Sequence, residues 1–426
     1  MTIAYVTLGC KLNYAETSTY ERGFKSAGFQ TVPWSKGADI FLVNTCSVTA
    51  TSDSKSRSII RKLHRISPGA PIIVTGCSAE LRRKEIEAIE GVSLVFGAVQ
   101  KGELVARTLD YLAGLNPELR AGAATLAEEY RAISAQTLPA YSIGGRTRSF
   151  LKVQDGCNNF CAYCTVPYAR GESRNIPICT ILRQAREIAA SGAKEIVLTG
   201  VNTGDFGRTT GEGFLDLLKA LNEVEGIERY RISSIEPNLI TEEIVDWIAS
   251  GTKFQPHFHI PLQSADDDIL KRMGRHYDTA FFRSRIEYIR KAMEGPGKPE
   301  VFFGIDLMVG LPGESEESFQ KGIDFLKELR PAFIHVFPYS RRPGTRAAKM
   351  PDQVPEETKA ERVRIMEGLC QELHDTFVAG NAGIRESVLW ESKQKDGQMS
   401  GYSGNYIRVS RPYDAALVGQ ITEVVL

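Results

Sequence analysis

Short β-branched runs alternate with charged amphipathic segments through the first 340 residues of this 426-residue chain. Four of these runs lie between residues 3 and 98, and six more lie between residues 149 and 340. Strands that alternate with helices predict parallel sheets joined by crossover helices, which is an α/β fold. A chain of this length is also expected to divide into two or three domains.

The two sets of runs predict two different α/β architectures. Residues 1–115 predict an α/β domain with a doubly wound parallel sheet. Residues 146–365 predict a partial, laterally open (β/α)6 barrel, because six β/α units fall short of the eight in a complete barrel. Residues 116–145 are rich in Ala and Gly and predict a linker.

The carboxy-terminal part has a different pattern. Residues 355–379 predict one charged helix, and the strands after it are short and interrupted by Gly, Ser and Pro. This pattern predicts a small β-barrel of about five strands in a domain at 366–426 that includes the end of the helix.

Composition narrows the class of protein. No apolar run approaches the roughly 18 residues that a membrane-spanning helix needs, and the amino terminus predicts a strand rather than a signal peptide. We therefore expect a cytoplasmic protein without a membrane partner. The 52 basic and 52 acidic residues cancel, so net charge alone does not indicate a polyanionic partner. Eight cysteines are too few for a disulfide scaffold of this size and favour metal binding or catalysis.

Three cysteines form a CxxxCxxC motif directly after the first strand of the second α/β region. Cys157, Cys161 and Cys164 stand in the segment DGCNNFCAYC. A compact loop with thiols at this spacing can hold three irons of a 4Fe-4S cubane and leave the fourth iron without a protein ligand. The alternative is a structural zinc loop, which needs a fourth ligand such as Asp155 or a distant histidine.

Three further cysteines, Cys10, Cys46 and Cys77, each follow a predicted strand of the amino-terminal region. Ligand sites of open α/β sheets lie at the carboxyl ends of strands, so we expect these thiols to converge. Taken alone, they could equally be buried core thiols. Cys179 and Cys370 fall inside predicted helices without partners, and we expect both in the core.

The segment CNNFCAYC on a partial barrel resembles the radical S-adenosylmethionine (SAM) superfamily, and the chain as a whole is similar to the methylthiotransferases. The similar segments include GCKLNYAET, VNTCSVT, CTVPYARGESR, PLQS and GLPGE, so the resemblance covers nearly the whole chain. It implies a 4Fe-4S cluster whose open iron binds SAM and a second 4Fe-4S cluster that carries sulfide or polysulfide. It also implies that the carboxy-terminal domain is a TRAM β-barrel. The implied cluster ligands are Cys157, Cys161 and Cys164 for the first cluster and Cys10, Cys46 and Cys77 for the second.

The resemblance also implies a set of SAM contacts at the strand ends, although ordinary packing is an alternative for each residue. An aromatic side chain is expected near the adenine, a glycine-rich strand end near the amino group, and polar side chains near the ribose and the barrel mouth. In that order the residues are Tyr163; Gly200 and Asn202; Ser234 and Glu236; and Gln263 and Asp306.

The acceptor implied by the resemblance is adenosine 37 of tRNA or an aspartate of a ribosomal protein. The segment FPYSRRPGTRAAKMPDQVP resembles the branch that methylthiolates N6-threonylcarbamoyladenosine in tRNA. Isopentenyladenosine and the ribosomal aspartate remain alternatives within the family. An iron-sulfur redox carrier or sensor, or a non-catalytic RNA-binding module, remains an alternative from another class.

The partners follow from that branch. A tRNA anticodon loop is expected as substrate, and an electron donor such as flavodoxin or ferredoxin is expected to reduce the clusters. SAM serves as methyl donor and as radical source, and the radical removes hydrogen from C2 of adenine, which has no acidity for acid-base catalysis to use. Five arginines are expected to hold loop phosphates or the threonyl carboxylate: Arg170, Arg174, Arg341, Arg342 and Arg346.

Overall fold

A computed structural model describes residues 1–47, 49–115, 137–144 and 146–426 of the chain. Its amino-terminal domain is a parallel five-stranded sheet in the order β2-β1-β3-β4-β5. Helices α1 and α5 pack on one face of this sheet, while α2 and α4 pack on the other, which confirms the doubly wound arrangement. The elements are β1 (Thr2–Thr7), α1 (Lys11–Ser26), β2 (Gln30–Thr31), β3 (Ile40–Thr45), α2 (Ala50–Ile66), β4 (Ile72–Gly76), α3 (Cys77–Leu81), α4 (Arg83–Glu87), β5 (Val92–Phe96) and α5 (Leu104–Leu115).

The central strands of this sheet are buried on both faces. All six residues of β3 and all five of β4 are buried, and both sequences are nearly continuous apolar runs instead of alternating ones. This is the pattern of parallel strands covered by helices on both sides. It explains why the sequence pattern identified these strands correctly.

Six parallel strands in chain order form the second domain, as two three-stranded sheets. Backbone hydrogen bonds such as that from Ile235 N to His259 O (3.1 Å) join the two sheets. Within the described residues, the first and last strands do not pair with each other, so the barrel is partial and open on one side, as predicted. The strands are β6 (Arg148–Lys152), β9 (Glu195–Thr199), β10 (Arg229–Ile232), β11 (His257–Gln263), β12 (Phe302–Val309) and β13 (Phe333–Pro338).

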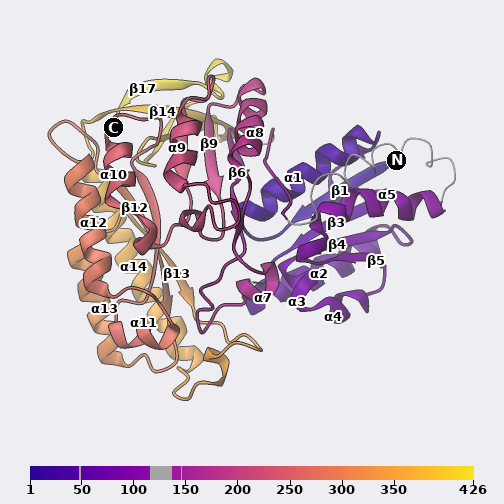
Figure 1. Cartoon of the computed structure of the whole chain (residues 1–426), viewed down its shortest axis with the longest axis horizontal. Helices are drawn as coiled ribbons and strands as arrows, with labels where there is room; N and C mark the ends of the chain where they lie inside the picture. The colour runs from indigo at the N-terminus through magenta and orange to yellow at the C-terminus, as the bar shows by residue number, and fades with distance from the viewer. Residues whose placement is uncertain (48, 116–136, 145) are drawn as a thin grey trace.

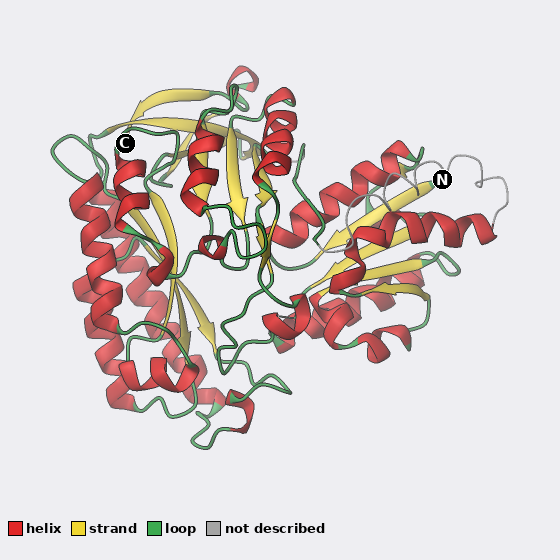
Figure 2. Ribbon diagram, viewed as in Figure 1, coloured by secondary structure: helices red, strands yellow, loops and turns green. Residues whose placement is uncertain are grey.

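Helices cover the outside of these strands (Figure 2). Their buried residues join those of the strands in one large apolar core. The helices with residues in this core are α8 (Ile178–Ala190), α9 (Phe214–Asn222), α10 (Glu242–Ala249), α11 (Asp267–Met273), α12 (Thr279–Met293), α13 (Glu316–Leu329) and α14 (Glu356–Gly380).

The amino-terminal domain spans the opening between β6 and β13. On the β6 side, the ring of Tyr14 packs edge-on against that of Phe150, with centroids 5.6 Å apart. On the β13 side, Arg342 forms an ion pair with Asp53 of α2. Figure 1 shows this domain, in indigo and purple, beside the barrel. The strand ends of the amino-terminal domain therefore face the barrel interior.

The carboxy-terminal domain is an antiparallel sheet of four strands in the order β16-β15-β14-β17, where the sequence pattern predicted about five. The strands are β14 (Arg385–Lys395), β15 (Gln398–Ser403), β16 (Arg408–Pro412) and β17 (Ile421–Val425). The sequence pattern missed β15. Asp396 and Gly397 both have positive φ (51° and 73°), which builds the two-residue turn of a hairpin between β14 and β15.

Residues 415–417 form a 3-10 helix that precedes β17. The sheet lies against the amino-terminal end of the barrel strands. There Arg231 donates to the carbonyls of Ser403 (2.8 Å) and Gly404 (2.7 Å).

Two predictions about single cysteines had opposite outcomes. Cys370 in α14 is buried, with its Sγ 3.4 Å from the carbonyl oxygen of Ile334, as expected of a core residue. Cys179 is exposed, so its assignment to the core was wrong. It lies in the first turn of α8, whose buried face carries Ile181, Ala185 and Ile188.

Of the predicted linker 116–145, residues 116–136 and 145 lie outside the described residues. Leu138 and Ala140, just after the undescribed stretch, are buried in the core of the amino-terminal domain. None of the described helices is long and apolar enough to cross a membrane.

Candidate functional site

The loop that carries Cys157, Cys161 and Cys164 lies between β7 (Gln154–Asp155) and α7 (Val166–Arg170) at the barrel mouth. Backbone N–H groups approach two of its sulfurs: Asn159 N lies 3.5 Å from Cys157 Sγ, and Val166 N lies 3.4 Å from Cys164 Sγ. Hydrogen bonds to sulfur stabilise thiolates and tune iron-sulfur clusters. The donors around this loop therefore suit thiolate ligands.

Burial keeps Cys157 and Cys164 protonated until a metal displaces the protons. It raises the pKa of Cys157 to about 11 and that of Cys164 to about 12. Thiolate ligands must lose these protons on binding, so iron loading releases protons from this loop. The loop thus has three ligands for a cluster and an apolar setting that disfavours free thiolates.

Arg275 provides the charged contact to the third sulfur. Its Nη1 donates to Cys161 Sγ at 3.0 Å and lies 3.4 Å from the Tyr163 hydroxyl, and its Nη2 pairs with the Glu236 carboxylate. The side chain of Arg275 is 3% exposed. One buried guanidinium therefore links the cluster loop to the end of β10.

Gln154 fixes the backbone of the loop. Its Nε2 donates to the carbonyl of Gly156 (2.8 Å), while its Oε1 accepts from the amides of Val201 and Asn202 (2.9 and 3.0 Å). Gly156 has φ +75°, and a Cβ there would lie 1.9 Å from the carbonyl oxygen of Glu172, so only glycine fits. The loop and the end of β9 are thereby held as one unit.

Most of the predicted SAM contacts gather at these strand ends. Asn202 Oδ1 accepts from the amide of Glu236 (3.2 Å), and the carbonyl of Ser234 accepts from Thr203 N (3.1 Å), which links the ends of β9 and β10. Gln263 lies at the end of β11 with φ +71°. The structure places Tyr163, Gly200, Asn202, Ser234, Glu236 and Gln263 in the loop or at these strand ends.

Asp306 is placed differently from the other predicted SAM contacts. Its carboxylate hydrogen bonds to His259 Nε2 (2.8 Å), and one ligand atom each of Asp306, His259 and His335 lies within 4.8 Å of the others. The rings of His259 and His335 stack with centroids 5.1 Å apart. Asp306 thus belongs to a polar group on β11, β12 and β13.

Cys10, Cys46 and Cys77 follow β1, β3 and β4, which are neighbouring strands, so the expected convergence is confirmed. A Cβ on Gly9 would lie 2.9 Å from Cys46 Sγ, and one on Gly76 would lie 2.3 Å from the Thr45 carbonyl oxygen. Both glycines have φ +100°. The strand order reverses between β1 and β3, which is where open α/β sheets bind ligands.

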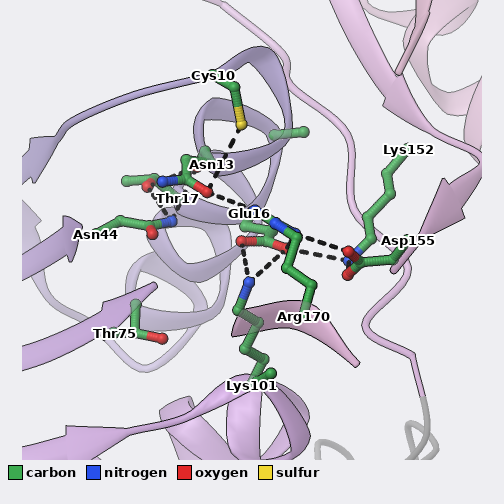
Figure 3. Close-up of polar contacts among 12 residues, drawn as sticks. Cys10, Asn13, Glu16, Thr17, Asn44, Thr75, Lys101, Lys152, Asp155 and Arg170 are labelled. Atoms are coloured by element: carbon green, nitrogen blue, oxygen red, sulfur yellow. Dashed lines mark hydrogen bonds and ion pairs between the residues drawn. The ribbon is translucent and has the colours of Figure 1, made fainter. Parts of the chain in front are cut away.

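A buried charge network joins this cysteine group to the barrel (Figure 3). Glu16 accepts from Lys101 (2.9 Å), Lys152 (3.0 Å) and Arg170 (3.2 Å), and each of these side chains is at most 4% exposed. Asp155 accepts from Lys152 (2.6 Å) and Arg170 (2.8 Å). Glu16 and Lys101 come from the amino-terminal domain, while the other three come from the barrel domain. The network therefore crosses the boundary between the two domains.

Cations outweigh carboxylates in this network, with three of the former and two of the latter. Burial raises the pKa of Cys77, whereas the nearby Arg170 and Lys101 lower it. Arg170 also donates to Asn13 Oδ1 (2.6 Å), which lies 3.9 Å from Cys10 Sγ. The excess positive charge can offset negative thiolates, so the amino-terminal cysteines could hold a metal cluster.

The same cations set the charge state of Glu16. Burial raises the pKa of its carboxyl, but Lys101, Lys152 and Arg170 together lower it by more, so the net pKa lies well below its usual range. Glu16 is therefore an anion at neutral pH. A buried anion that is held by three cations is sensitive to the loss of any one partner.

The five predicted substrate arginines do not share one surface. Arg170 and Arg342 are buried in ion pairs with carboxylates inside the protein. The other three contact backbone carbonyls: Arg174 those of Arg170 and Glu172, Arg341 that of Ala348, and Arg346 that of Phe160 in the cluster loop. Arg174 also forms an ion pair with Asp155 (3.6 Å).

Sequence reasoning missed Gln154, Glu16, Lys152 and Arg275. Lys152 carried a usable signal, because it interrupts the otherwise apolar start of the strand FLKV, and a buried lysine needs an anionic partner. Arg275 carried none, since it lies in a loop after α11 where a charged residue is ordinary.

The comparisons with known proteins agree with this geometry. Residues 151–326 match the Radical SAM superfamily, and residues 2–97 match an uncharacterized protein family, UPF0004. The threonylcarbamoyladenosine tRNA methylthiotransferase MtaB of Bacillus subtilis is 38% identical over 430 residues, covering 99% of this chain and 93% of the relative. A protein of the same name from Aquifex aeolicus is 35% identical over 96% of this chain and all of the relative.

Other relatives and one solved structure extend the comparison. A tRNA-2-methylthio-N(6)-dimethylallyladenosine synthase of Carboxydothermus hydrogenoformans is 30% identical, covering 94% of this chain and 92% of the relative. The radical S-adenosylmethionine methyltransferase TsrM of Kitasatospora setae has a TM-score of 0.55 at 13% identity, covering 94% of this chain and 80% of that chain. At that identity the structural likeness shows the fold alone.

An open parallel barrel with three thiols at its mouth and a match over residues 151–326 defines a radical SAM protein. That class implies one 4Fe-4S cluster and SAM, and the loop of Cys157, Cys161 and Cys164 fits the cluster. The full-length similarity is more specific: this chain belongs to the methylthiotransferase family.

Replacing Arg275 by glutamine is expected to lower the free energy of unfolding by about 2–3 kcal/mol, because the nearly buried Glu236 carboxylate and Cys161 lose their charged donor. Urea unfolding of the iron-free protein measures this change. Arg283→Gln, which removes a surface pair with Glu328, is the matched control and should change the value by less than about 1 kcal/mol. Equal effects of the two variants would contradict the role given to Arg275.

Proposed function

We propose that this protein is a tRNA methylthiotransferase that converts N6-threonylcarbamoyladenosine at position 37 to its 2-methylthio derivative. The observation that carries the proposal is the placement of the two cysteine groups. Helix α7, directly after Cys164, packs against α3, which begins at Cys77, and Arg170 of α7 joins the Glu16 network. The names of the MtaB relatives supply the substrate.

The two cysteine groups have separate tasks in this proposal. With a 4Fe-4S cluster and SAM bound, the loop of Cys157, Cys161 and Cys164 supplies a 5′-deoxyadenosyl radical after reduction by a donor such as flavodoxin or ferredoxin. Cys10, Cys46 and Cys77 hold a second 4Fe-4S cluster with the sulfide or polysulfide to be inserted. Radical chemistry is required because the C2–H of adenine is not acidic.

The chain's own residues position the reactants. The unit formed by Gln154, Gly200 and Asn202 holds SAM at the ends of β9 and β10, next to the cluster loop. Ser234 and Glu236 hold the ribose, with Arg275 fixing the carboxylate of Glu236. Tyr163 and Gln263 complete the SAM site from the loop and from β11.

The RNA contacts lie around the barrel mouth and on the carboxy-terminal domain. Arg341 and Arg346 bind anticodon-loop phosphates, because they lie in the segment after β13 and Arg346 reaches the cluster loop. The four-stranded sheet acts as a TRAM-like RNA-binding domain, with Tyr413, which is 39% exposed, available for base stacking. Arg170 and Arg342 instead hold the domains together.

Nucleoside mass spectrometry of tRNA from a strain that lacks this protein tests the proposal. Threonylcarbamoyladenosine is expected to accumulate without its 2-methylthio group, and the wild-type gene should restore the modification. A gene that encodes Cys157→Ala should not restore it. Loss of methylthio-isopentenyladenosine instead, or an unchanged nucleoside profile, would refute the assignment of substrate.

A further inference from the structure

A cavity of about 270 Å³ lies where the three domains meet. Its wall includes Gly9, Cys10 and Lys11 of the amino-terminal domain, Phe150 and Val197 inside the barrel, and Tyr406 of the carboxy-terminal domain. This volume is below that of pockets for drug-sized ligands, so the cavity suits a substituent and not a nucleotide chain. Because Cys10 lines it, whatever enters lies next to the amino-terminal cysteines.

The wall of the cavity is positively charged. It includes Lys11, Arg146, Arg148 and Arg231, and none of the described residues that line it is a carboxylate. Arg231 and Arg148 are already paired, with Glu195 (2.8 Å) and Glu391 (3.0 Å) respectively.

The other two cations have no such partner. Within the described part of the chain, neither Lys11 nor Arg146 forms an ion pair, and the guanidinium of Arg146 lies over the rings of Tyr14 (4.6 Å) and Phe150 (5.6 Å). Two cationic side chains are therefore available to an anionic ligand.

Two neutral polar groups in the same wall have unused hydrogen-bonding capacity. His257 is 8% exposed, and its Nδ1 has no hydrogen-bond partner among the described residues. The Tyr406 hydroxyl accepts from Arg148 Nη1 (2.6 Å), which leaves its own hydrogen free to donate.

Tyr406 holds its place at a conformational cost. It has φ +66°, a region that non-glycine residues rarely adopt, and its ring packs against those of His257 (4.9 Å) and Tyr402 (4.9 Å). Strained residues of this kind persist where the surrounding structure fixes them, often at ligand sites. With this strained backbone conformation, the Tyr406 side chain lies in the cavity wall.

We propose that this cavity binds the carboxylate of an amino-acid substituent on the target adenine, with Lys11 and Arg146 as its charged partners. This inference rests on the proposed function and names the determinant of its substrate choice. Tyr14, Phe150 and Val197 supply apolar contacts for the rest of the substituent, while Tyr406 and His257 add neutral donors. A substrate with an uncharged alkyl substituent would leave these cations unpaired and is therefore disfavoured.

Binding of synthetic anticodon stem-loop RNAs to the reconstituted full chain, without SAM or reductant, tests the proposal. Three RNAs of one sequence carry threonylcarbamoyladenosine, its methyl ester or plain adenosine at the target position. Wild type should bind the free carboxylate at least about tenfold more tightly than the ester or adenosine. Arg146→Gln and Lys11→Gln should each remove most of this preference and leave binding of adenosine RNA unchanged. Both side chains are exposed at the cavity edge, so these variants should fold.

Lys36→Gln is the matched control, because Lys36 is an exposed lysine of the amino-terminal domain that does not line the cavity. This variant should keep the full preference. If Arg146→Gln and Lys11→Gln weakened the binding of all three RNAs equally, the two cations would contact phosphates instead of the carboxylate. If these variants left the binding of all three RNAs unchanged, the two cations would contact no part of the RNA. Either result would overturn the proposal. If wild type methylthiolates the modified RNA while these variants keep their preference, only this inference fails. If wild type shows the preference but forms no product, the proposed function fails instead.

Discussion

Glu16→Gln is expected to lower the free energy of unfolding by about 3–5 kcal/mol, because three buried cations then lose their shared carboxylate. The side chain of Glu16 is fully buried, so water cannot replace the lost charge. Urea unfolding followed by tryptophan fluorescence measures the change. The loss should be present across neutral pH, because the carboxyl pKa lies below its usual range and Glu16 is charged there.

The sign of the pH dependence gives a second readout for the same variant. A carboxyl whose folded pKa is lowered contributes stability above its unfolded pKa and loses that contribution as the pH falls. Wild type and Glu16→Gln should therefore converge in stability in acid. Glu21→Gln, on the same helix with a solvent-exposed hydrogen bond to Thr31, should change stability by less than about 0.5 kcal/mol. If Glu21→Gln destabilised the protein as much as Glu16→Gln, disruption of the buried charge network would not explain the effect of Glu16→Gln.

Cys10→Ala and Cys157→Ala are each expected to remove one of two clusters. After anaerobic reconstitution, wild type should hold about eight irons and eight sulfides, and each variant about four of each. Both variants should lose methylthio transfer. They should differ in SAM cleavage, which Cys10→Ala retains and Cys157→Ala loses.

Cys179→Ala is the matched control, because Cys179 is exposed on α8 and belongs to neither cysteine group. It should keep both clusters and full activity. If Cys10→Ala kept all its iron, or if Cys157→Ala still cleaved SAM, the assignment of the two cysteine groups would be wrong.

The sequence predicted the fold well where burial is two-sided. The strands β3 and β4 are continuous apolar runs, and cysteines at their ends follow from the geometry of parallel sheets. The carboxy-terminal domain was predicted less well, because β15 has the sequence QMSGYS, with few β-branched or large apolar residues. Its strongest local signal is Asp396-Gly397, a typical two-residue hairpin turn.

Within the site, the cysteines could be predicted and their supporting contacts could not. Motif spacing identifies the thiols, but Arg170 is bound to Glu16, 154 residues earlier in the chain. No local pattern indicates such a pair. Arg342 was predicted to bind substrate, but it pairs with Asp53 across the domain boundary. Asp53 lies 289 residues away in the chain, so the sequence likewise did not indicate this pair.

We propose that one chain carries out radical generation and sulfur insertion on two cysteine groups that face each other. The most direct test of this proposal is to incubate the reconstituted wild type and Cys10→Ala with reductant, methyl-labelled SAM and threonylcarbamoyladenosine tRNA. Wild type should form 5′-deoxyadenosine and a nucleoside that gains one sulfur and one labelled methyl group. Cys10→Ala should form 5′-deoxyadenosine alone. A methylthio nucleoside from Cys10→Ala, or a wild-type product with a methyl group but no sulfur, would show that the amino-terminal cysteines do not supply the inserted sulfur.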